Sequence, residues 1–294
     1  MAERVIMLLL ASTILAAQVV GPAVAPRPQG ATVNLLGTRP GETGLWMPPN
    51  AGDERLVDLD SASSAASNPF SIDANPLSRL PRLDGISPAA AAQLVGKLTV
   101  SMVPFQPWAK ALYAYRSEQF FEPHTRCKPS GGPRQFLTPY GVEFVDAPEL
   151  KRMFIVDIGG PHTMRIVYMD GRPHPKDLSP SYLGHSTGRW ENDTLIIDSV
   201  GFNERFWMDR QGLPHTEKLH LVERITRTDP NILKYQVTVD DPGAYTSTWT
   251  TGIVLRWTPG AELFEYVCQD NNHAPELMLG TDQTSVATGA AFVP

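Results

Sequence analysis

The chain has 294 residues, of which 42% are hydrophobic and 19% are charged, and its formal net charge is -6. Neither acidic nor basic residues form a long run of one sign. A nucleic-acid-binding protein needs a clustered basic face, so the charge pattern argues against one. The length that remains after the amino-terminal segments are set aside is enough for one sizeable core.

Residues 1–25 have the pattern of a signal peptide. Arg4 precedes residues 5–20, which are almost wholly apolar, and small residues follow near a cleavage site. The apolar stretch is short for a membrane span, and no later run of about 18 apolar residues occurs. We therefore expect a periplasmic or secreted protein that has no membrane span after its leader is removed.

The next segment, residues 26–86, is rich in Pro, Gly, Ser and Ala, which predicts a flexible arm with little structure of its own. Within the arm, a short piece could dock on the main domain through Leu45 and Trp46. We place the folded domain at residues 87–280 and a carboxy-terminal tail at residues 281–294.

Two short helices are predicted at the start of this domain. Ser87 followed by Pro88 is a typical helix start, with Ser as the N-cap and Pro at the first helical position. It indicates a helix over residues 89–98. A second helix is expected from residue 107 to about residue 119, because apolar and aromatic residues recur there on one face.

From residue 152 onward, short alternating segments separated by turn sequences predict β-strands. The short links between them, without helices, favour an antiparallel meander, and closing the sheet would remove its exposed edges. The predicted fold class is therefore mainly β, an antiparallel meander that closes into a lipocalin-like barrel. The candidate strands are residues 152–158, 163–169, 183–190, 194–200, 218–228, 233–240, 246–257 and 262–269.

Alternation along these strands places several charged side chains on apolar faces. Glu223 and Glu265 are two of them, and His185 and Arg189 share the face of an apolar neighbour. Because an ionised carboxylate is not buried cheaply without partners, Glu223 either pairs inside or has a raised pKa. Two roles remain open for these carboxylates: a structural ion pair with Arg189, or contact with a ligand. Eight strands enclose just enough space for side chains or one small ligand.

General acid–base chemistry is the leading functional prediction. A histidine beside a carboxylate can move a proton in an apolar cavity, where burial tunes the pKa toward neutrality. Such a site suits isomerisation, elimination or cyclisation of a small, partly apolar molecule, and it needs no cofactor. The candidate catalytic residues are His185, Glu223, His215 and Asp209.

Other side chains would bind the substrate. Arginines would hold an anionic or carbonyl group, and aromatic rings would pack on the rest of the molecule. The same lining could instead hold an apolar ligand without turnover, so a non-catalytic small-molecule carrier of the cell envelope is the alternative. The candidate substrate-binding residues are Arg189, Arg205, Trp207, Trp249, Tyr235 and Glu265.

Metal and serine chemistry are less favoured. Five histidines offer metal ligands, but none has an HxH, HExxH or CxxC spacing, so we predict no metal. Residues 184–188 superficially match G-x-S-x-G, but that motif needs a strand–turn–helix context, and here strand follows strand. The five histidines are His162, His174, His185, His215 and His220.

The chain has two cysteines, Cys127 and Cys268. In an oxidising compartment they could form one long-range disulfide, or they could remain two separate buried thiols. A cysteine nucleophile is less favoured, because neither residue has an obvious histidine partner beside it. We expect the disulfide, which would tie the segment before the sheet to the end of the domain.

Four motifs together resemble a family of secreted bacterial β-rich proteins: GRPHP at 171–175, GHSTGRWENDTL at 184–195, VGFN at 200–203 and EYVC at 265–268. The resemblance covers roughly residues 104–272 and rests on the combined pattern. Asn192 departs from it, because glycine is expected in that turn, although asparagine also tolerates positive φ. The resemblance implies a secreted β-rich domain and carries over no catalytic residues.

Overall fold

The computed structural model describes residues 43–48, 55–58, 60, 93–118, 122–159, 161–270 and 272. The predicted signal peptide and carboxy-terminal tail lie outside these residues, and so do most of the predicted arm and residues 89–92 of the first predicted helix. In the described part of that helix, residues 93–95 are helical. In the part of the chain that is described, no helix is long and apolar enough to cross a membrane.

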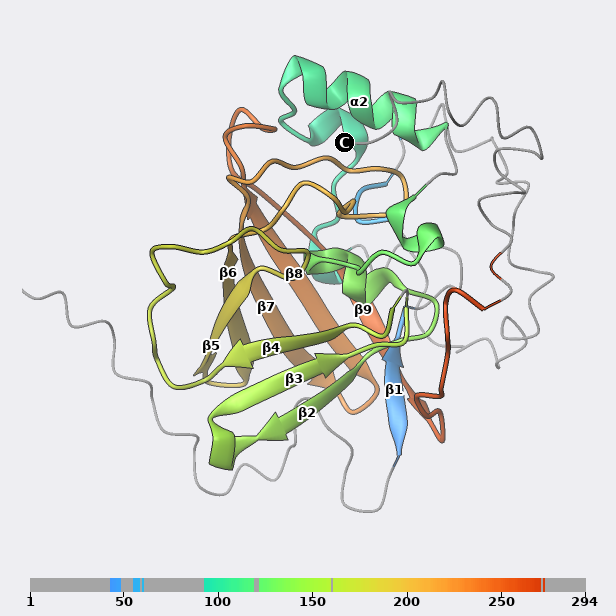
Figure 1. Cartoon of the computed structure of the whole chain (residues 1–294), viewed down its shortest axis with the longest axis vertical. Helices are drawn as coiled ribbons and strands as arrows, with labels where there is room; N and C mark the ends of the chain where they lie inside the picture. Colours follow the sequence, from blue (N-terminus) through green and yellow to red (C-terminus); the bar gives the residue numbers. More distant parts are fainter. Residues whose placement is uncertain are drawn as a thin grey trace, which may run out of the picture.

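Helical segments are few and short. The second predicted helix is present as α2 (Pro107–Ser117), which begins with proline and lies across one end of the sheet (Figure 1). Short 3₁₀ helices are η3 (Val100–Met102), η4 (Pro123–Arg126), η5 (Gly132–Leu137) and η6 (Pro148–Leu150).

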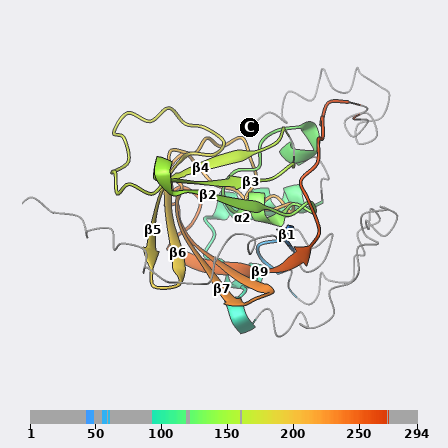
Figure 2. The same cartoon turned by 90° about the horizontal axis from the view of Figure 1, so that it is seen from below.

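The described strands form one mixed sheet of nine, which confirms the mainly β class. Their order in the sheet is β1-β9-β8-β7-β6-β5-β4-β3-β2. The sheet curls, so that β2, β3 and β4 lie opposite β7 and β9 (Figure 2). The bounds are β1 (Gly44–Met47), β2 (Glu143–Ala147), β3 (Arg152–Val156), β4 (Met164–Tyr168), β5 (His185–Glu191), β6 (Thr194–Val200), β7 (His220–Asp229), β8 (Ile232–Asp240) and β9 (Trp249–Pro259).

The predicted meander is correct for most pairs but wrong between β4 and β5, which are parallel. Antiparallel neighbours need only a tight turn, whereas parallel neighbours need a long connection that returns the chain to the starting end. Residues 169–184 form that connection. By contrast, β5 and β6 are joined by the predicted tight turn, in which Asn192 has a φ of 52°.

The last predicted strand, residues 262–269, is absent. β9 ends at Pro259, and Gly260 follows with a φ of 73°, which turns the chain away from the sheet. Residues 261–267 have no strand structure, and Glu265 is exposed. The prediction that alternation buries Glu265 is therefore wrong.

The two edges of the sheet meet at one point. A single antiparallel bridge joins Trp46 to Val142, with N–H···O distances of 3.0 and 2.9 Å. Trp46 is fully buried, and its ring lies 5.2 Å from that of Trp257. The piece of the arm that carries Leu45 and Trp46 thus belongs to the sheet, but the sheet is not closed into a barrel.

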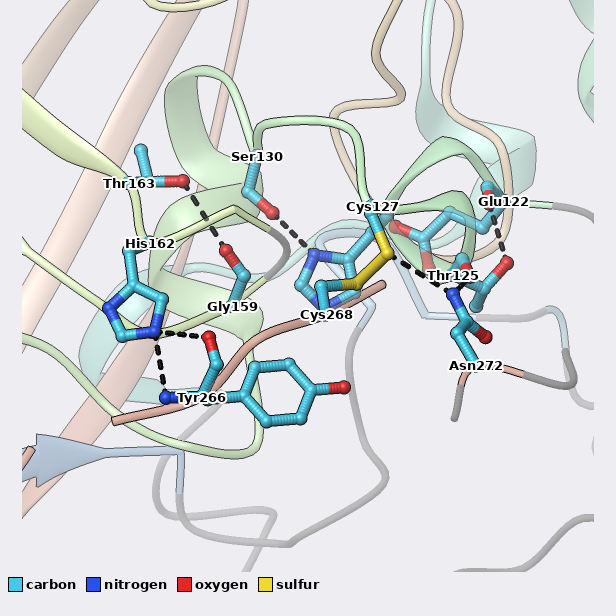
Figure 3. The surroundings of a disulfide bond; sticks show 11 residues. Glu122, Thr125, Cys127, Ser130, Gly159, His162, Thr163, Tyr266, Cys268 and Asn272 are labelled. Carbon is cyan, nitrogen blue, oxygen red and sulfur yellow. Dashed lines mark hydrogen bonds between the residues drawn. A yellow bond between two sulfur atoms is a disulfide. The ribbon is translucent and has the colours of Figure 1, made fainter. Parts of the chain in front are cut away.

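Cys127 and Cys268 form a disulfide, with an S–S distance of 2.05 Å and a Cα–Cα distance of 5.6 Å, which confirms the predicted pairing. The bond ties the end of η4 to the segment that follows β9 (Figure 3). Beside it, Nε2 of His162 accepts the backbone N–H of Tyr266 at 2.9 Å. A disulfide is compatible with an extracytoplasmic protein.

Candidate functional site

On the inner face of the curled sheet, five successive strands each carry one polar side chain. Arg165 lies on β4, Ser186 on β5, Ser199 on β6, Glu223 on β7 and Tyr235 on β8. Each is at most 1% exposed. We call these five residues the inner belt.

Hydrogen bonds join the whole inner belt. Nη1 of Arg165 donates to Oε1 of Glu223 at 3.0 Å, and Nη2 donates to Oε2 of the same carboxylate. Arg165 also donates from Nε to Ser186 (3.0 Å) and from Nη2 to Ser199 (2.7 Å). The hydroxyl of Tyr235 donates to Oε1 of Glu223 at 2.8 Å. Both carboxylate oxygens are therefore occupied by protein donors.

The inner belt is a structural element. Burial alone would lower the pKa of Arg165, but the Glu223 carboxylate outweighs burial and raises that pKa. Burial and the same carboxylate raise the pKa of Tyr235. The predicted pairing of Glu223 with Arg189 is wrong, because the buried partner is Arg165. Glu223 has no solvent access, and protein donors bind both of its oxygens, so it is poorly placed to act on a substrate.

Asp209 and His215 were also predicted to be catalytic, and both are buried in the loop between β6 and β7. Asp209 accepts two backbone N–H groups, at 3.2 and 3.0 Å, and burial raises its pKa to about 6. Nε2 of His215 donates to the carbonyl of Phe206 at 3.0 Å, and burial lowers the pKa of His215 to about 4. These bonds fix the loop.

The predicted substrate-binding residues are not brought together. Arg189 instead forms a surface ion pair with Glu191 at 2.7 Å. The ring of Tyr235 lies 4.4 Å from that of Phe136, so a side chain fills the inner space at this position. Of the other candidates, Trp207 and Trp249 are buried, whereas Arg205 and Glu265 are exposed.

The outer face of the same strands carries a second polar group. Alternation along β5, β6 and β7 turns His185, Asp198 and His220 away from the core. In the sheet register Asp198 lies opposite residue 187, two positions after His185, and opposite residue 222, two positions after His220. The connection between β4 and β5 supplies His174. We call His174, His185, Asp198 and His220 the outer cluster.

Hydrogen bonds link the outer cluster into a chain, in the order His185, His174, Asp198, His220. Nδ1 of His185 lies 2.7 Å from Nδ1 of His174. Nε2 of His174 and Nε2 of His220 lie 3.0 and 2.9 Å from the same oxygen, Oδ1 of Asp198. The side chains of His174, Asp198 and His220 are 23%, 32% and 38% exposed. A molecule from solvent can therefore reach this chain.

The partners determine where the protons lie. A carboxylate only accepts hydrogen bonds, so Nε2 of His174 and Nε2 of His220 each carry a hydrogen toward Asp198. A neutral His174 then has its lone pair on Nδ1, and the hydrogen of the bond to His185 belongs to Nδ1 of His185. The lone pair on Nε2 of His185 has no hydrogen-bond partner among the described residues.

The histidines at the two ends of the chain have opposite pKa shifts. Burial is the main cause that lowers the pKa of His185, and the neighbouring His174 and Arg172 lower it further. The hydrogen bond to Asp198 raises the pKa of His220. The same bond lowers the pKa of Asp198. Surroundings that push two pKa values apart are typical of an acid–base pair.

Tyr168, the last residue of β4, lies beside His185. The two rings are stacked, with centroids 5.0 Å apart and planes 19° apart. The guanidinium carbons of Arg172 and Arg152 lie 4.1 and 5.4 Å from the centre of the Tyr168 ring. Arg172 also donates to both oxygens of Asp170. Tyr168 therefore lies between His185 and two cations, of which Arg172 acts on His185 electrostatically.

Sequence reasoning named only His185 of the outer cluster as catalytic. It treated His174 and His220 as possible metal ligands, and it missed Asp198. Alternation was the available signal, because it turns Asp198 and His220 to one face, but only the register shows that they meet. Across the described residues, no group of three or more His, Cys, Asp or Glu side chains is arranged to hold a metal ion.

No protein-family model matches this chain, and no curated protein or solved structure matches it either. The resemblance to secreted bacterial proteins therefore stays a prediction. The chemistry of the outer cluster is the basis on which a function can be assigned.

Proposed function

We propose that the protein is an enzyme that transfers protons to and from a small molecule at the outer cluster, as an isomerase, lyase or cyclase does. One observation carries the proposal: a chain of hydrogen bonds joins two part-exposed histidines through one carboxylate and shifts their pKa values in opposite directions. His185 is the base and His220 is the acid.

In this mechanism the substrate gives its proton to Nε2 of His185. The imidazolium that forms keeps its Nδ1–H bond to His174, and Nε2–H of His174 remains bonded to Asp198. The carboxylate therefore stabilises the cation through an intervening imidazole, as a buried aspartate supports a catalytic histidine in hydrolases. No covalent intermediate or redox step is required.

His220 then returns a proton to another position of the substrate. His185 and His220 lie on β5 and β7, two strands apart, so their backbones are separated by roughly 10 Å. A small, partly apolar molecule that lies across the outer cluster, on the solvent side of His174 and Asp198, would contact both. The part-exposed side chain of His220 then recovers a proton from solvent, and His185 releases to solvent the proton that it took, so both groups return to their starting states.

We also propose that the protein is secreted or periplasmic and that β1 and β2 pair in solution beyond the bridge between Trp46 and Val142, which would close the curled sheet into a lipocalin-like barrel. The disulfide supports the location, and the two hydrogen bonds of the bridge support the closure. Slow hydrogen exchange of the Val142 amide would agree with closure, whereas exchange as fast as in an unfolded chain would contradict it.

The enzymatic proposal is tested by incubating the protein in D2O with a panel of small ketones and 2-oxo acids. Proton NMR measures how fast their carbon-bound hydrogens exchange for deuterium. His185→Gln should slow the exchange by about 10²–10⁴-fold, because it removes the base. Its free energy of unfolding should change by less than about 1 kcal/mol, since the side chain is part-exposed.

His162→Asn is the matched control. His162 precedes β4 at the end opposite Tyr168 and has a φ of 57°, which asparagine tolerates. This variant should exchange its substrates as fast as the wild type. Equal rates in the wild type and His185→Gln would rule out His185 as the base. Binding of panel members without any exchange would instead identify a carrier.

A further inference from the structure

The outer face holds a row of side chains that leads from a cation to the outer cluster. In the sheet register Arg152 pairs with Tyr168, Tyr168 with Thr187, and Thr187 with Asp198. All four residues are only partly buried. His185 lies two residues before Thr187 and stacks on Tyr168. His185 and Arg152 both lie against the ring of Tyr168, so a small molecule at the edge of this ring would touch the base at one end and Arg152 at the other.

The two cations beside Tyr168 differ in their partners. Arg172 donates to both oxygens of Asp170, so its charge is largely compensated. Arg152 forms no ion pair with any described residue, and its guanidinium lies over the Tyr168 ring. The surroundings of Tyr168 thus hold two guanidiniums and one carboxylate, with the charge of Arg152 uncompensated.

An uncompensated guanidinium is a strong partner for a carboxylate or for an oxygen that becomes negative. When a base removes a proton next to a carbonyl group, the electron pair of the C–H bond moves onto the carbonyl oxygen. A positive group placed beforehand at that oxygen lowers the barrier. The position of Arg152 relative to His185 suits this chemistry.

We infer that the substrate is a small carbon acid that carries a carboxylate next to its carbonyl group, and that Arg152 holds this anionic end beside Tyr168. This inference rests on the proposed function. In the reaction the C–H bond breaks, the proton passes to Nε2 of His185, and the electron pair forms an enolate next to Arg152. The carbonyl forms again when the carbon is protonated.

Pyruvate and acetone test this inference, because they share a methyl ketone and differ by one carboxylate. The wild type should exchange pyruvate protons with a kcat/KM about tenfold to hundredfold higher than that for acetone, as expected for one charge-assisted hydrogen bond. Arg152→Gln should remove this preference, because it should slow pyruvate exchange more than acetone exchange: only pyruvate presents a carboxylate to the guanidinium. Equal rates for both ketones in the wild type would overturn the inference while leaving the proposed function intact.

Arg224→Gln is the matched control. Arg224 lies on the same face, on β7, and its side chain bonds to Glu191 at 3.2 Å instead of flanking Tyr168. This variant should keep the full preference for pyruvate. A loss as large as that of Arg152→Gln would show a general charge effect and would contradict a specific role of Arg152.

A binding measurement separates the inference from the catalytic proposal. The pKa of His185 is measured by NMR with and without sodium acetate. Acetate should raise this pKa in the wild type and in Arg224→Gln but not in Arg152→Gln. Such a result without any exchange of either ketone would support the anion site and refute the enzymatic function. No effect of acetate, or an equal effect in Arg152→Gln, would refute the anion site.

Discussion

On β5, β6 and β7, neighbouring residues point to opposite faces of the sheet. Ser186, Ser199 and Glu223 lie on the inner face. His185 and Asp198, which directly precede the two serines, and His220, three residues before Glu223, lie on the outer face. In each group one carboxylate accepts hydrogen bonds from two other side chains. On the inner face every donor and acceptor of the group has a protein partner, whereas on the outer face Nε2 of His185 can still accept a proton from a substrate.

This difference follows from the cost of burial. A buried charge is tolerated only when it is paired and its hydrogen bonds are made. A complete buried network therefore has no donor or acceptor free to bind a substrate. At the outer cluster water can bond to a polar atom that has no protein partner, so an incomplete network costs little. The face of the strand, rather than the type of residue, separates a structural carboxylate from a functional one.

The largest effect should come from removing the charge of Glu223. Glu223→Gln leaves Arg165 buried without a counter-charge and should lower the free energy of unfolding by about 3–5 kcal/mol, measured by urea denaturation. The double variant Arg165→Met with Glu223→Leu is the control and should recover much of the loss, because both charges are gone. A loss below about 1 kcal/mol for the single variant would show that the inner belt is not structural.

Removing one donor to the inner belt should have a smaller effect. Tyr235→Phe deletes the hydroxyl that donates to Glu223 at 2.8 Å and changes little else in the shape of the side chain. The expected loss is about 1.5–3 kcal/mol, as for hydrogen bonds to charged groups. An unfolding midpoint equal to that of the wild type in urea would contradict this prediction.

A buried carboxyl outside the inner belt should give the protein a pH dependence. Asp157 is fully buried, and burial raises its pKa from an ordinary 3.8 to about 7. The folded state therefore holds a proton that the unfolded state releases, and stability falls as the pH rises between about 4 and 7, by at most about 1.4 kcal/mol per pH unit.

Asp157→Asn should remove this fall, because asparagine can still accept the Gly159 N–H that Oδ1 accepts at 2.7 Å. His215, with a pKa near 4, acts in the opposite direction over much of the same range. The quantity to measure is therefore the difference in unfolding free energy between the variant and the wild type at each pH. A difference that does not grow from pH 4 to pH 7 would contradict the burial effect.

The smallest effect on stability should come from Asp198. Its pKa is lowered, so its ionised form adds stability above the ordinary pKa, and that stability is lost as the pH falls through the lowered value. Because the side chain is part-exposed, Asp198→Asn should cost no more than about 1 kcal/mol at pH 7. It should also lower the pKa of His220, measured by NMR. A His220 pKa equal to that of the wild type would show that the two groups are not coupled.

Local patterns predicted much of the fold. Alternation and turn residues located β6, β7 and β8, and the buried side of Glu223 followed from its apolar neighbours. The parallel pair of β4 and β5 was missed, because the direction of a strand depends on the path of its connection, residues 169–184, and not on its own sequence. The segment after Pro259 alternates like a strand but pairs with no strand in the part of the chain that the structure describes.

The candidate site was harder to predict, because the choice of inner face is made by the whole sheet. On β4 the more apolar face carries Met164, Ile166 and Tyr168, yet Arg165 and Val167 point inward. Glu223 on a strand distant in sequence compensates the buried charge of Arg165, and no local pattern records that pairing. On β5, too, the whole sheet decides which face is buried, and it turns His185 outward, whereas the sequence predicted it inside.

The most direct test of the outer cluster is the protonation of its histidines, read from ¹⁵N chemical shifts near pH 8. The hydrogen-bonded chain predicts that His185 carries its hydrogen on Nδ1, while His174 and His220 carry theirs on Nε2. In Asp198→Asn this pattern should be lost for His174. A wild-type His185 with its hydrogen on Nε2 would have no lone pair facing a substrate, and that result would contradict the assignment of His185 as the base.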